Sequence, residues 1–317
     1  MSISVTTHVE QGDRPYQEDR HLVVEVDDGI TLGVVCDGHG DDSSGDMCAD
    51  VSIKNFVTVF KKVYDEKRSS NIRPSISCLL HKAVKHTVMS WDRLSLGVRT
   101  MNKIAKASGD DRAAIRDRAF ARMTRKKYAA YFENGMDSGC TLSACVVDVP
   151  HRKVFTANLG DSRTIICTGN AMISTVDHAV NSELARKRGV PVENGRVAGE
   201  LAMMGAIGDN TPTLAGLVSR KTDVRTYALE KNMQIVIASD GFFDNYSDQS
   251  ACMHLLKSDA TAFSLVQSGR PPSGTYHDNT SVILIKASCE SEADDDKGVY
   301  ATFQDINDSL QALNIAK

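Results

Sequence analysis

Acidic residues recur in this chain where an apolar, β-prone run meets a turn. The residues at such positions are Glu18, Asp19, Asp37, Asp161, Asp240 and Asp278. One aspartate of this kind is an ordinary turn residue, but several at sheet edges indicate a shared acidic cleft. Clustered carboxylates repel one another unless cations neutralise them. Because the sequence has no His or Cys spacing typical of zinc sites, we expect hard divalent cations. Two such ions can activate a bridging water and hold a phosphoryl group during in-line attack, so the pattern favours a two-metal hydrolase.

The run 31–36 is the clearest of the elements that must position these carboxylates. It is apolar and β-branched without a helical period, which predicts a buried strand. The strand must end at Asp37, because Gly38-His39-Gly40 is turn chemistry. The two glycines let the backbone pass close to a bound group. An ordinary strand-to-loop turn is the alternative for this stretch taken alone.

Other short β-prone runs, separated by turn residues, predict a meander of antiparallel strands. The expected strands cover residues 3–10, 21–27, 142–149, 154–159, 163–168, 172–176, 235–238 and 281–286. Apolar residues at helical spacing predict long helices over 44–64 and after Pro74. A short capped helix is expected over 182–188, and a helix or strand over 301–315.

Residues 92–127 differ from their surroundings because they are polar and mostly basic, with few large apolar side chains. An amphipathic helix over 112–131 is compatible with this pattern. The basic cluster at 122–127 could be a nuclear signal or contact an acidic partner, but we favour a solvated helix face. Residues 290–296 are acidic, and we expect them to be a flexible tail segment. Because we find no internal repeat and no linker, we expect one domain over 1–317, with a basic insertion at about 92–127.

The composition is that of a soluble globular protein, with 41% hydrophobic and 25% charged residues among 317. A net charge of −4 argues against a general attraction to nucleic acid or anionic membranes. No apolar run approaches the ~20 residues of a membrane span, and the N-terminus lacks the pattern of a secretory signal. The eight cysteines form no C-x-x-C pair. We expect them to be reduced and buried, in a cytoplasmic or nuclear protein.

Eight short motifs, in order over roughly residues 8–287, resemble those of the protein phosphatase 2C family of metal-dependent serine/threonine phosphatases. Residues 14–19 (RPYQED) resemble the family's R-x-x-x-E-D, and residues 35–40 (VCDGHG) resemble its F-D-G-H-G. The others are residues 138–141 (SGCT), 157–163 (ANLGDSR), 177–178 (DH), 201–209 (LAMMGAIGD), 238–244 (ASDGFFD) and 278–280 (DNT). Each motif is weak alone, but their order and spacing are specific.

The resemblance implies an α+β fold, a sandwich of two antiparallel β-sheets flanked by α-helices, with a dinuclear Mg²⁺ or Mn²⁺ site at one end. It implies that the ligands of the two ions are Glu18, Asp19, Asp37, the Gly38 carbonyl, Asp240 and Asp278. It also implies a third, more weakly held ion bound by Asp161, Asp240 and Asp244. Arg14 would bind the substrate phosphate, since a guanidinium fork suits two oxygens. His39 would be the general acid that protonates the leaving serine or threonine oxygen, and a metal-bound water would be the nucleophile.

Some positions depart from the family's pattern. Met204-Gly205 replaces the usual Ser-Arg, Cys36 stands where an aromatic residue is common, and Asp41 stands where a second glycine is common. None of these changes removes an expected metal ligand. The missing arginine at position 205 therefore puts the local packing in doubt more than the chemistry.

Two other functions stay open at this level. A catalytically dead relative would bind a phosphoprotein or a scaffold without turnover. A different two-metal phosphoesterase, such as a nuclease, would need a basic face that the net charge does not favour. Because every expected ligand is present, we favour an active phosphatase of phosphorylated proteins. We expect a monomer with no nucleic-acid or membrane partner.

Overall fold

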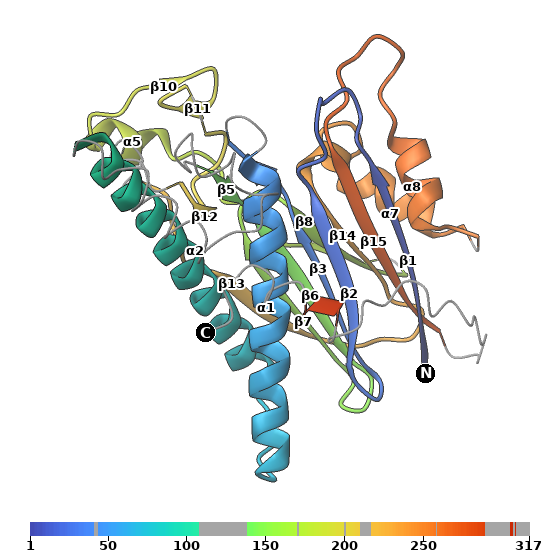
Figure 1. Ribbon diagram of the computed structural model, residues 1–317. Coiled ribbons are helices and arrows are strands. Elements are labelled where there is room, and N and C mark those ends of the chain that lie inside the picture. Colours follow the sequence, from blue (N-terminus) through green and yellow to red (C-terminus); the bar gives the residue numbers. More distant parts are fainter. Residues whose placement is uncertain are drawn as a thin grey trace.

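The computed structural model describes residues 1–40, 44–107, 138–169, 171–199, 201–209, 217–257, 259–288, 305, 306 and 308. Two five-stranded sheets pack face to face, and helices cover the outer face of each (Figure 1). This four-layer arrangement is the expected α+β sandwich.

Both large sheets are antiparallel throughout, as the predicted meander requires. The first sheet has the strand order β1-β15-β14-β8-β9. Its strands are β1 (Ser2–Glu10), β15 (Thr280–Ser288), β14 (Gln234–Ala238), β8 (Arg163–Thr168) and β9 (Ala171–Ser174). The second sheet has the order β13-β7-β6-β3-β2. Its strands are β13 (Asp223–Ala228), β7 (Lys153–Leu159), β6 (Leu142–Asp148), β3 (Ile30–Cys36) and β2 (Arg20–Asp27).

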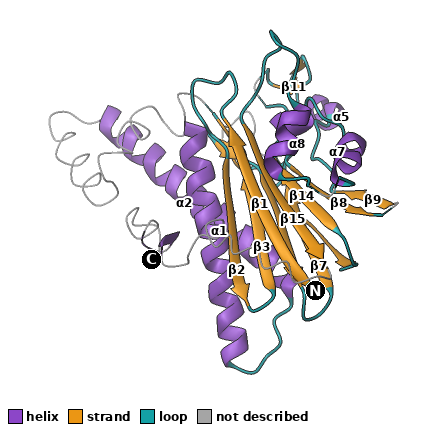
Figure 2. Ribbon diagram, turned by 90° about the vertical axis from the view of Figure 1, so that its right-hand side faces the viewer, coloured by secondary structure: helices purple, strands orange, loops and turns teal. Residues whose placement is uncertain are grey.

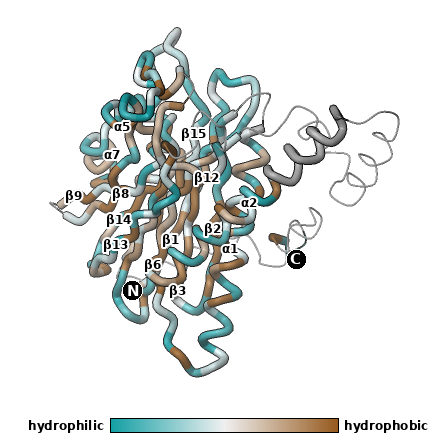
Figure 3. Tube along the Cα trace, turned by 90° about the vertical axis from the view of Figure 1, so that its left-hand side faces the viewer, coloured by the Kyte–Doolittle hydropathy of each residue, from teal (hydrophilic) through white to brown (hydrophobic). Residues whose placement is uncertain are grey.

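Alternating side chains of the central strands fill the core on both faces of each sheet. In β3, Leu32 and Val34 pack under the helices, while Val35 packs between the sheets. In β14, Ile237 packs between the sheets and Val236 packs under the helices of the other side. Because side chains alternate along a strand, a strand buried on both faces is a continuous apolar run. Figure 3 shows this as hydrophobic colour along the strands.

Two long helices, α1 (Ser44–Ser69) and α2 (Ile76–Ala107), cover the second sheet, where Phe56, Phe60 and Trp91 are buried. The shorter α7 (Asp248–Leu255) and α8 (Ala262–Gly269) cover the first sheet, as Figures 1 and 2 show from two sides. A one-turn helix, α6 (Asp240–Phe243), follows β14. Helix α5 (Ser182–Lys187) lies beside a small hairpin formed by β10 (Val192–Glu193) and β11 (Arg196–Val197).

The predicted strands and the three predicted helices within the described residues are confirmed, with small shifts at their ends. The sequence patterns did not indicate β13, α7 or α8. Helix α2 also continues to Ala107, through the start of the basic segment, and the segments 112–131 and 290–296 lie outside the described residues. Residues 305, 306 and 308 are helical, and Ile306 is buried in the core under α1 and α2. In the described ranges, no helix has both the length and the apolar character needed to cross a membrane.

The prediction of reduced cysteines is wrong at two positions. Cys167 of β8 and Cys252 of α7 form a disulfide, with their Cα atoms 5.9 Å apart. Because α7 was not predicted, its packing on the first sheet, which brings Cys252 to the end of β8, could not be foreseen. The other described cysteines are free thiols. Cys78 is exposed, so the prediction of burial is wrong there, and the following are buried as predicted: Cys36, Cys48, Cys140 and Cys145.

Candidate metal-binding cleft

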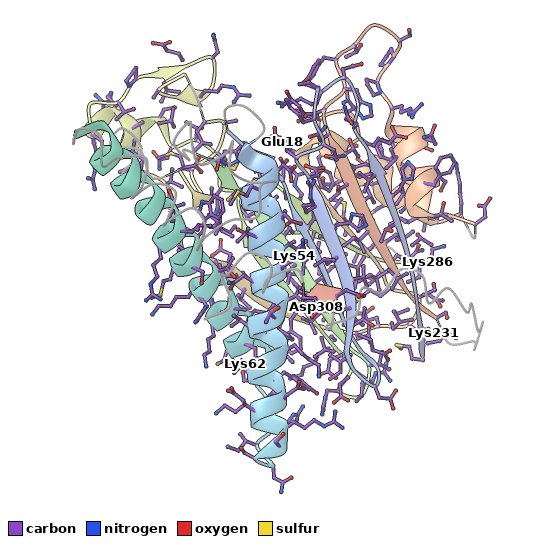
Figure 4. The ribbon with its side chains drawn as sticks, in the orientation of Figure 1. Glu18, Lys54, Lys62, Lys231, Lys286 and Asp308 are labelled. Atoms are coloured by element: carbon purple, nitrogen blue, oxygen red, sulfur yellow. A yellow bond between two sulfur atoms is a disulfide. The ribbon has the colours of Figure 1, made fainter. Side chains whose placement is uncertain are left out.

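The predicted site residues meet in one cleft at an end of the sandwich. The cleft has a volume of about 870 Å³. Figure 4 shows Glu18 beside the first turn of α1, at the end of the sheets away from Lys231. The predicted residues that line the cleft are Arg14, Glu18, Asp37, Gly38, His39, Asp161, Asp240, Asp244 and Asp278. Asp19 lies behind this lining and is only 2% exposed.

Asp37 and Asp240 are placed by the ends of two strands, one from each sheet. β3 ends at Cys36, and the Asp37 N–H then donates to Oγ1 of Thr141 at 3.0 Å. The Asp37 carbonyl accepts the Thr141 N–H at 2.8 Å. On the facing sheet, β14 ends at Ala238, two residues before Asp240. The rigid strands therefore fix both carboxylates at the same end of the molecule.

Asp19 is enclosed by the chain that follows β14 and by β15. Its Oδ2 accepts the Ser239 hydroxyl at 2.7 Å, and Oγ of Ser239 accepts the Ser281 N–H at 2.9 Å. Burial raises the pKa of Asp19 to about 7, and the charges of Asp240 and Asp278 contribute to that rise. A buried carboxylate of this kind is costly to ionise unless a cation lies nearby.

The same electrostatic effect extends across the cleft. Burial and the charge of Asp240 raise the pKa of Asp161 to about 7 and that of Asp244 to about 6. Burial and then Asp240 also raise the pKa of Asp37 well above its usual value, and burial raises the pKa of Glu18. Apart from Glu18, whose pKa is raised by burial only, these carboxylates therefore oppose one another's ionisation, because like charges that are close together in a low dielectric repel.

The carboxylates fit a hard divalent cation. Several of their oxygens are buried and have no hydrogen-bond partner among the described residues: Glu18 Oε1, Asp19 Oδ1 and Asp161 Oδ1. As the side chains stand in the described part of the chain, no group of three or more His, Cys, Asp or Glu residues is placed so that it could hold a metal ion. A cation would supply the missing partners and compensate the charge, and oxygen donors suit Mg²⁺ or Mn²⁺.

Arg14 lines the cleft and contacts one of the predicted metal ligands. Its Nη2 donates to Oδ2 of Asp278 at 2.5 Å, and this bond raises the pKa of Arg14 further. The ring of Tyr276 lies 5.9 Å from Cζ of Arg14, and Nε of Arg14 has no hydrogen-bond partner among the described residues. The guanidinium thus lies at the cleft, where one of its N–H groups is hydrogen-bonded to Asp278.

Asn279 is a positioning residue to which the motif comparison gave no role. Its Oδ1 accepts the Glu18 N–H at 2.8 Å, and its Nδ2 donates to the carbonyls of Gln11 and Tyr16 at 2.7 and 2.9 Å. The residue is 5% exposed. It therefore holds the loop that carries Arg14 and Glu18 against the start of β15. The only signal in the sequence was its place directly after a predicted ligand.

Arg163 is a second residue whose role sequence reasoning missed. Its Nε and Nη2 donate to the two oxygens of Asp177 at 3.0 and 2.5 Å, and its Nη1 donates to Oδ1 of Asp248 on α7 at 2.5 Å. Its Cζ also lies 4.6 Å from the ring centre of Phe243 on α6. Arg163 thereby ties the turn that carries Asp161 to α6 and α7 at the rim of the cleft.

His39 contacts an aspartate outside the predicted ligand set. Its Nε2 lies 3.0 and 2.9 Å from the two carboxylate oxygens of Asp209. Burial alone would lower the pKa of His39, but the adjacent Asp209 carboxylate outweighs it and raises the pKa to about 9. Asp209 belongs to the motif at 201–209, and the sequence gave no reason to pair it with a histidine 170 positions away.

His178 fills the space beside Gly205, the position at which the family's pattern has an arginine. A Cβ atom on Gly205 would lie 2.0 Å from Nδ1 of His178, so the imidazole occupies the space in which a side chain would begin. The His178 N–H donates to the Gly160 carbonyl at 2.9 Å, and the His178 carbonyl accepts the Met204 N–H at 2.7 Å. The space left by the missing arginine side chain is therefore filled by the imidazole of His178.

The chain belongs to the protein phosphatase 2C family, whose sequence pattern matches residues 32–260. Probable protein phosphatase 2C 21 of Arabidopsis thaliana is 26% identical over 269 residues, which cover 75% of this chain and 71% of that protein. Protein phosphatase ppm-1.G of Caenorhabditis elegans is 35% identical over 128 residues, or 36% of this chain. The match spans only 26% of the length of ppm-1.G.

Solved structures have the same fold. A sex-determining protein of Caenorhabditis elegans aligns with a TM-score of 0.60 over 96% of this chain and 67% of that chain, at 18% identity. The catalytic domain of the serine/threonine phosphatase PstP, solved in complex with two manganese ions, aligns with a TM-score of 0.54 over 90% of this chain and 98% of that chain, at 15% identity. At these identities the likeness concerns the arrangement of sheets and helices.

Proposed function

We propose that this protein is a serine/threonine phosphatase that hydrolyses phosphoserine and phosphothreonine monoesters of proteins at a dinuclear Mg²⁺ or Mn²⁺ site. The observation that carries the proposal is the group of buried carboxylates that share one cleft, raise one another's pKa and leave oxygens without partners. Membership of the protein phosphatase 2C family supports the reaction type, and the two manganese ions in the PstP structure support the choice of metal.

Carboxylates from both sheets would hold the ions. The proposed ligands of two ions are Glu18, Asp19, Asp37, the Gly38 carbonyl, Asp240 and Asp278, and those of a third, weaker site are Asp161, Asp240 and Asp244. When bound, the ions supply Lewis-acid stabilisation of the phosphoryl oxygens and lower the pKa of a water molecule. The strand ends that carry Asp37 and Asp240 keep the spacing of the cleft fixed, so little reorganisation is needed during the reaction.

Arg14 would bind two oxygens of the substrate phosphate. A guanidinium presents two parallel N–H groups that match a phosphate, and the Nε of Arg14 has no partner among the described residues. One Nη of Arg14 donates a hydrogen bond to Asp278, so a phosphate would compete with Asp278 for that donor. Engagement of Asp278 by a cation would release Arg14 toward the substrate.

His39 would donate a proton to the leaving oxygen of serine or threonine. An alkoxide is a poor leaving group, so a positioned acid lowers the barrier. The imidazole lines the cleft next to the backbone of the proposed ligand Gly38, which places it beside the phosphate if the ions bind as proposed.

The direct test is release of phosphate from a phosphothreonine peptide by the full chain. We expect hydrolysis that requires Mn²⁺ or Mg²⁺ and that a zinc-selective chelator leaves nearly unchanged, because the ligands are all oxygen atoms. Full activity after exhaustive treatment with EDTA would contradict the metal assignment. A folded protein that binds the phosphopeptide in Mn²⁺ without hydrolysing it would instead be a catalytically dead binding protein.

A further inference from the structure

A small three-stranded antiparallel sheet lies at the cleft, apart from the two large sheets. Its strands are β4 (Gly38–His39), β5 (Gly139–Cys140) and β12 (Ile207–Gly208), with β5 in the middle. His39 and Gly208 both lie opposite Gly139 in the register. His39 and the residue after β12, Asp209, therefore approach each other from the two edges of this small sheet.

The side chains of His39 and Asp209 meet across the middle strand. Nε2 of the imidazole lies 2.9 Å from Oδ2 of Asp209, whose side chain is 6% exposed. The backbone of Asp209 has a φ of +51°, which aspartate tolerates better than most residues. Its N–H donates to the Ser138 carbonyl at 3.2 Å. The position of this carboxylate is therefore set by the backbone around it.

Gly139 provides the room for this contact. A Cβ atom at position 139 would lie 2.3 Å from Oδ2 of Asp209 and 2.5 Å from Nε2 of His39. Neither atom belongs to the end of a long flexible side chain, so the pair could not move aside easily. A larger residue here would separate the histidine from the carboxylate.

Arg220 holds the segment that carries Asp209. Its Nη1 donates to the Ala206 carbonyl and its Nη2 donates to the Gly208 carbonyl, one on each side of Ile207. These two bonds span β12 and end at the residue directly before Asp209.

The backbone of the residue before Arg220 is paired with the same segment. The Ser219 N–H donates to the Met204 carbonyl at 2.8 Å, and the Ser219 carbonyl accepts the Ala206 N–H at 3.3 Å. The arginine that is usual in the family at position 205 is absent here, and Arg220 brings a guanidinium to this segment from elsewhere in the chain.

We propose that Asp209 and Arg220 are positioning residues for His39. Arg220 fixes the turn after β12, and Asp209 holds Nε2 of the imidazole. With Nε2 engaged, the imidazole is held in one orientation at the cleft, and its Nδ1 is buried without a hydrogen-bond partner among the described residues. A carboxylate that fixes the orientation of a catalytic histidine is the arrangement of the hydrolytic triads. The inference rests on the proposed phosphatase function, in which His39 is the general acid.

The test compares a poor leaving group with a good one. Threonine leaves as a basic alkoxide and needs a proton, whereas p-nitrophenolate is stable without one. Asp209→Asn preserves the size of the side chain and its tolerance of a positive φ and removes the charge. We expect kcat for a phosphothreonine peptide to fall on the order of 10–10²-fold. For p-nitrophenyl phosphate, kcat should stay within about threefold of wild type, because that reaction does not need the acid.

A double-mutant cycle shows whether Asp209 acts through His39. His39→Gln should lower kcat for the peptide roughly 10²–10⁴-fold. Adding Asp209→Asn to that variant should change kcat by no more than about twofold, because residues that act as one unit are not additive. Arg220→Met should show the same selective loss to a smaller extent, and Arg220→Lys should restore part of it.

The matched control is Asp148→Asn at the other end of the sheets. Asp148 is also a buried aspartate beside a histidine, with Oδ1 2.8 Å from Nδ1 of His151. Because it lies away from the cleft, its replacement should leave kcat for both substrates unchanged.

If Asp209→Asn does not fold, as judged by its Tm, Gly139→Ala can replace it. The new Cβ should separate Asp209 from His39 and give the same selective loss of kcat for the peptide.

The outcomes separate this inference from the proposed function. Equal losses on the two substrates, or an additive loss in the double variant, would show that Asp209 maintains the cleft rather than acting through His39. In Gly139→Ala, an equal loss on both substrates or no loss at all would contradict the inference in the same way. Failure of the wild-type protein to hydrolyse either substrate in Mn²⁺ would instead overturn the proposed function.

Discussion

The cleft end and the opposite end of the second sheet both carry buried or half-buried acidic side chains, but these have different neighbours. At the opposite end, Oδ1 of Asp148 accepts the His151 N–H at 3.0 Å and also contacts the imidazole. Asp27 accepts the Tyr64 hydroxyl at 2.9 Å and pairs with Arg68 of α1. Each of these acids thus has a hydrogen-bond or ion-pair partner other than a carboxylate.

At the cleft end, burial and the charges of other carboxylates raise the pKa of several acids. Asp19, Asp37 and Asp161 all have a raised pKa for these reasons. Folding alone does not favour such an arrangement, since buried charges are usually paired. The number of acids at a strand end therefore says little about function, whereas acids that are buried beside other carboxylates mark a candidate functional site.

The largest effect is expected from the cleft acids themselves. Asp37→Asn or Asp240→Asn should lower kcat at saturating Mn²⁺ on the order of 10³-fold, because several kcal/mol of transition-state stabilisation depend on the ions. Without metal, the Tm of either variant should equal or exceed that of wild type, because repulsion between carboxylates falls. Steady-state kinetics with p-nitrophenyl phosphate would measure the first effect, and near wild-type kcat in Asp37→Asn would refute the ligand assignment.

Asp278 differs from the other cleft acids because it forms an ion pair with Arg14. Replacing Arg14 shows what this pair is for. If Arg14 binds the phosphate, Arg14→Ala should raise KM and lower kcat/KM by roughly tens to hundreds-fold for any phosphate ester. If it served only to compensate Asp278, as Arg68 compensates Asp27, the variant would lose stability and keep its KM. Kinetics and thermal unfolding of the same preparation distinguish these two results.

A smaller effect, on stability alone, is expected at the opposite end. Asp148→Asn should lower the free energy of unfolding by about 1–3 kcal/mol, because the hydrogen bonds to His151 lose their charged acceptor. Its kcat in Mn²⁺ should match that of wild type. Urea denaturation measures the free energy of unfolding. A clear loss of kcat in a folded Asp148→Asn protein would show that acids at the opposite end also serve catalysis.

The antiparallel strands and the acids of the cleft were predictable because their signals are local, whereas the sandwich of two sheets was implied by the family resemblance. An apolar run that ends in Asp-Gly, as at Asp37 and Asp240, indicates both a strand and its last turn. The short helices over the first sheet were missed although each has a local cap. Thr261 and Ser264 form a capping box at the start of α8, and the Ser247 hydroxyl accepts the Ser250 N–H at the start of α7. With only eight residues each, these helices show too little periodicity to detect.

Contacts between distant segments could not be predicted from the sequence. The pairing of His39 with Asp209 depends on the register of three two-residue strands, for which no periodic pattern exists. The Cys167–Cys252 disulfide depends on how α7 packs on the first sheet. Asn279 reaches back to the loop before β2 only because β1 and β15 pair along their full length.

The effect of Mn²⁺ on thermal unfolding of the full chain tests most directly whether the cleft binds cations. If the carboxylates of the cleft form a cation site, Mn²⁺ at a hundred times its Kd should stabilise the folded protein by ~2.7 kcal/mol and raise Tm by roughly 4 °C. The same rise should appear in Asp148→Asn and be lost or greatly reduced in Asp37→Asn. A folded wild-type protein whose Tm does not respond to Mn²⁺ or Mg²⁺, or an undiminished rise in Asp37→Asn, would contradict the account.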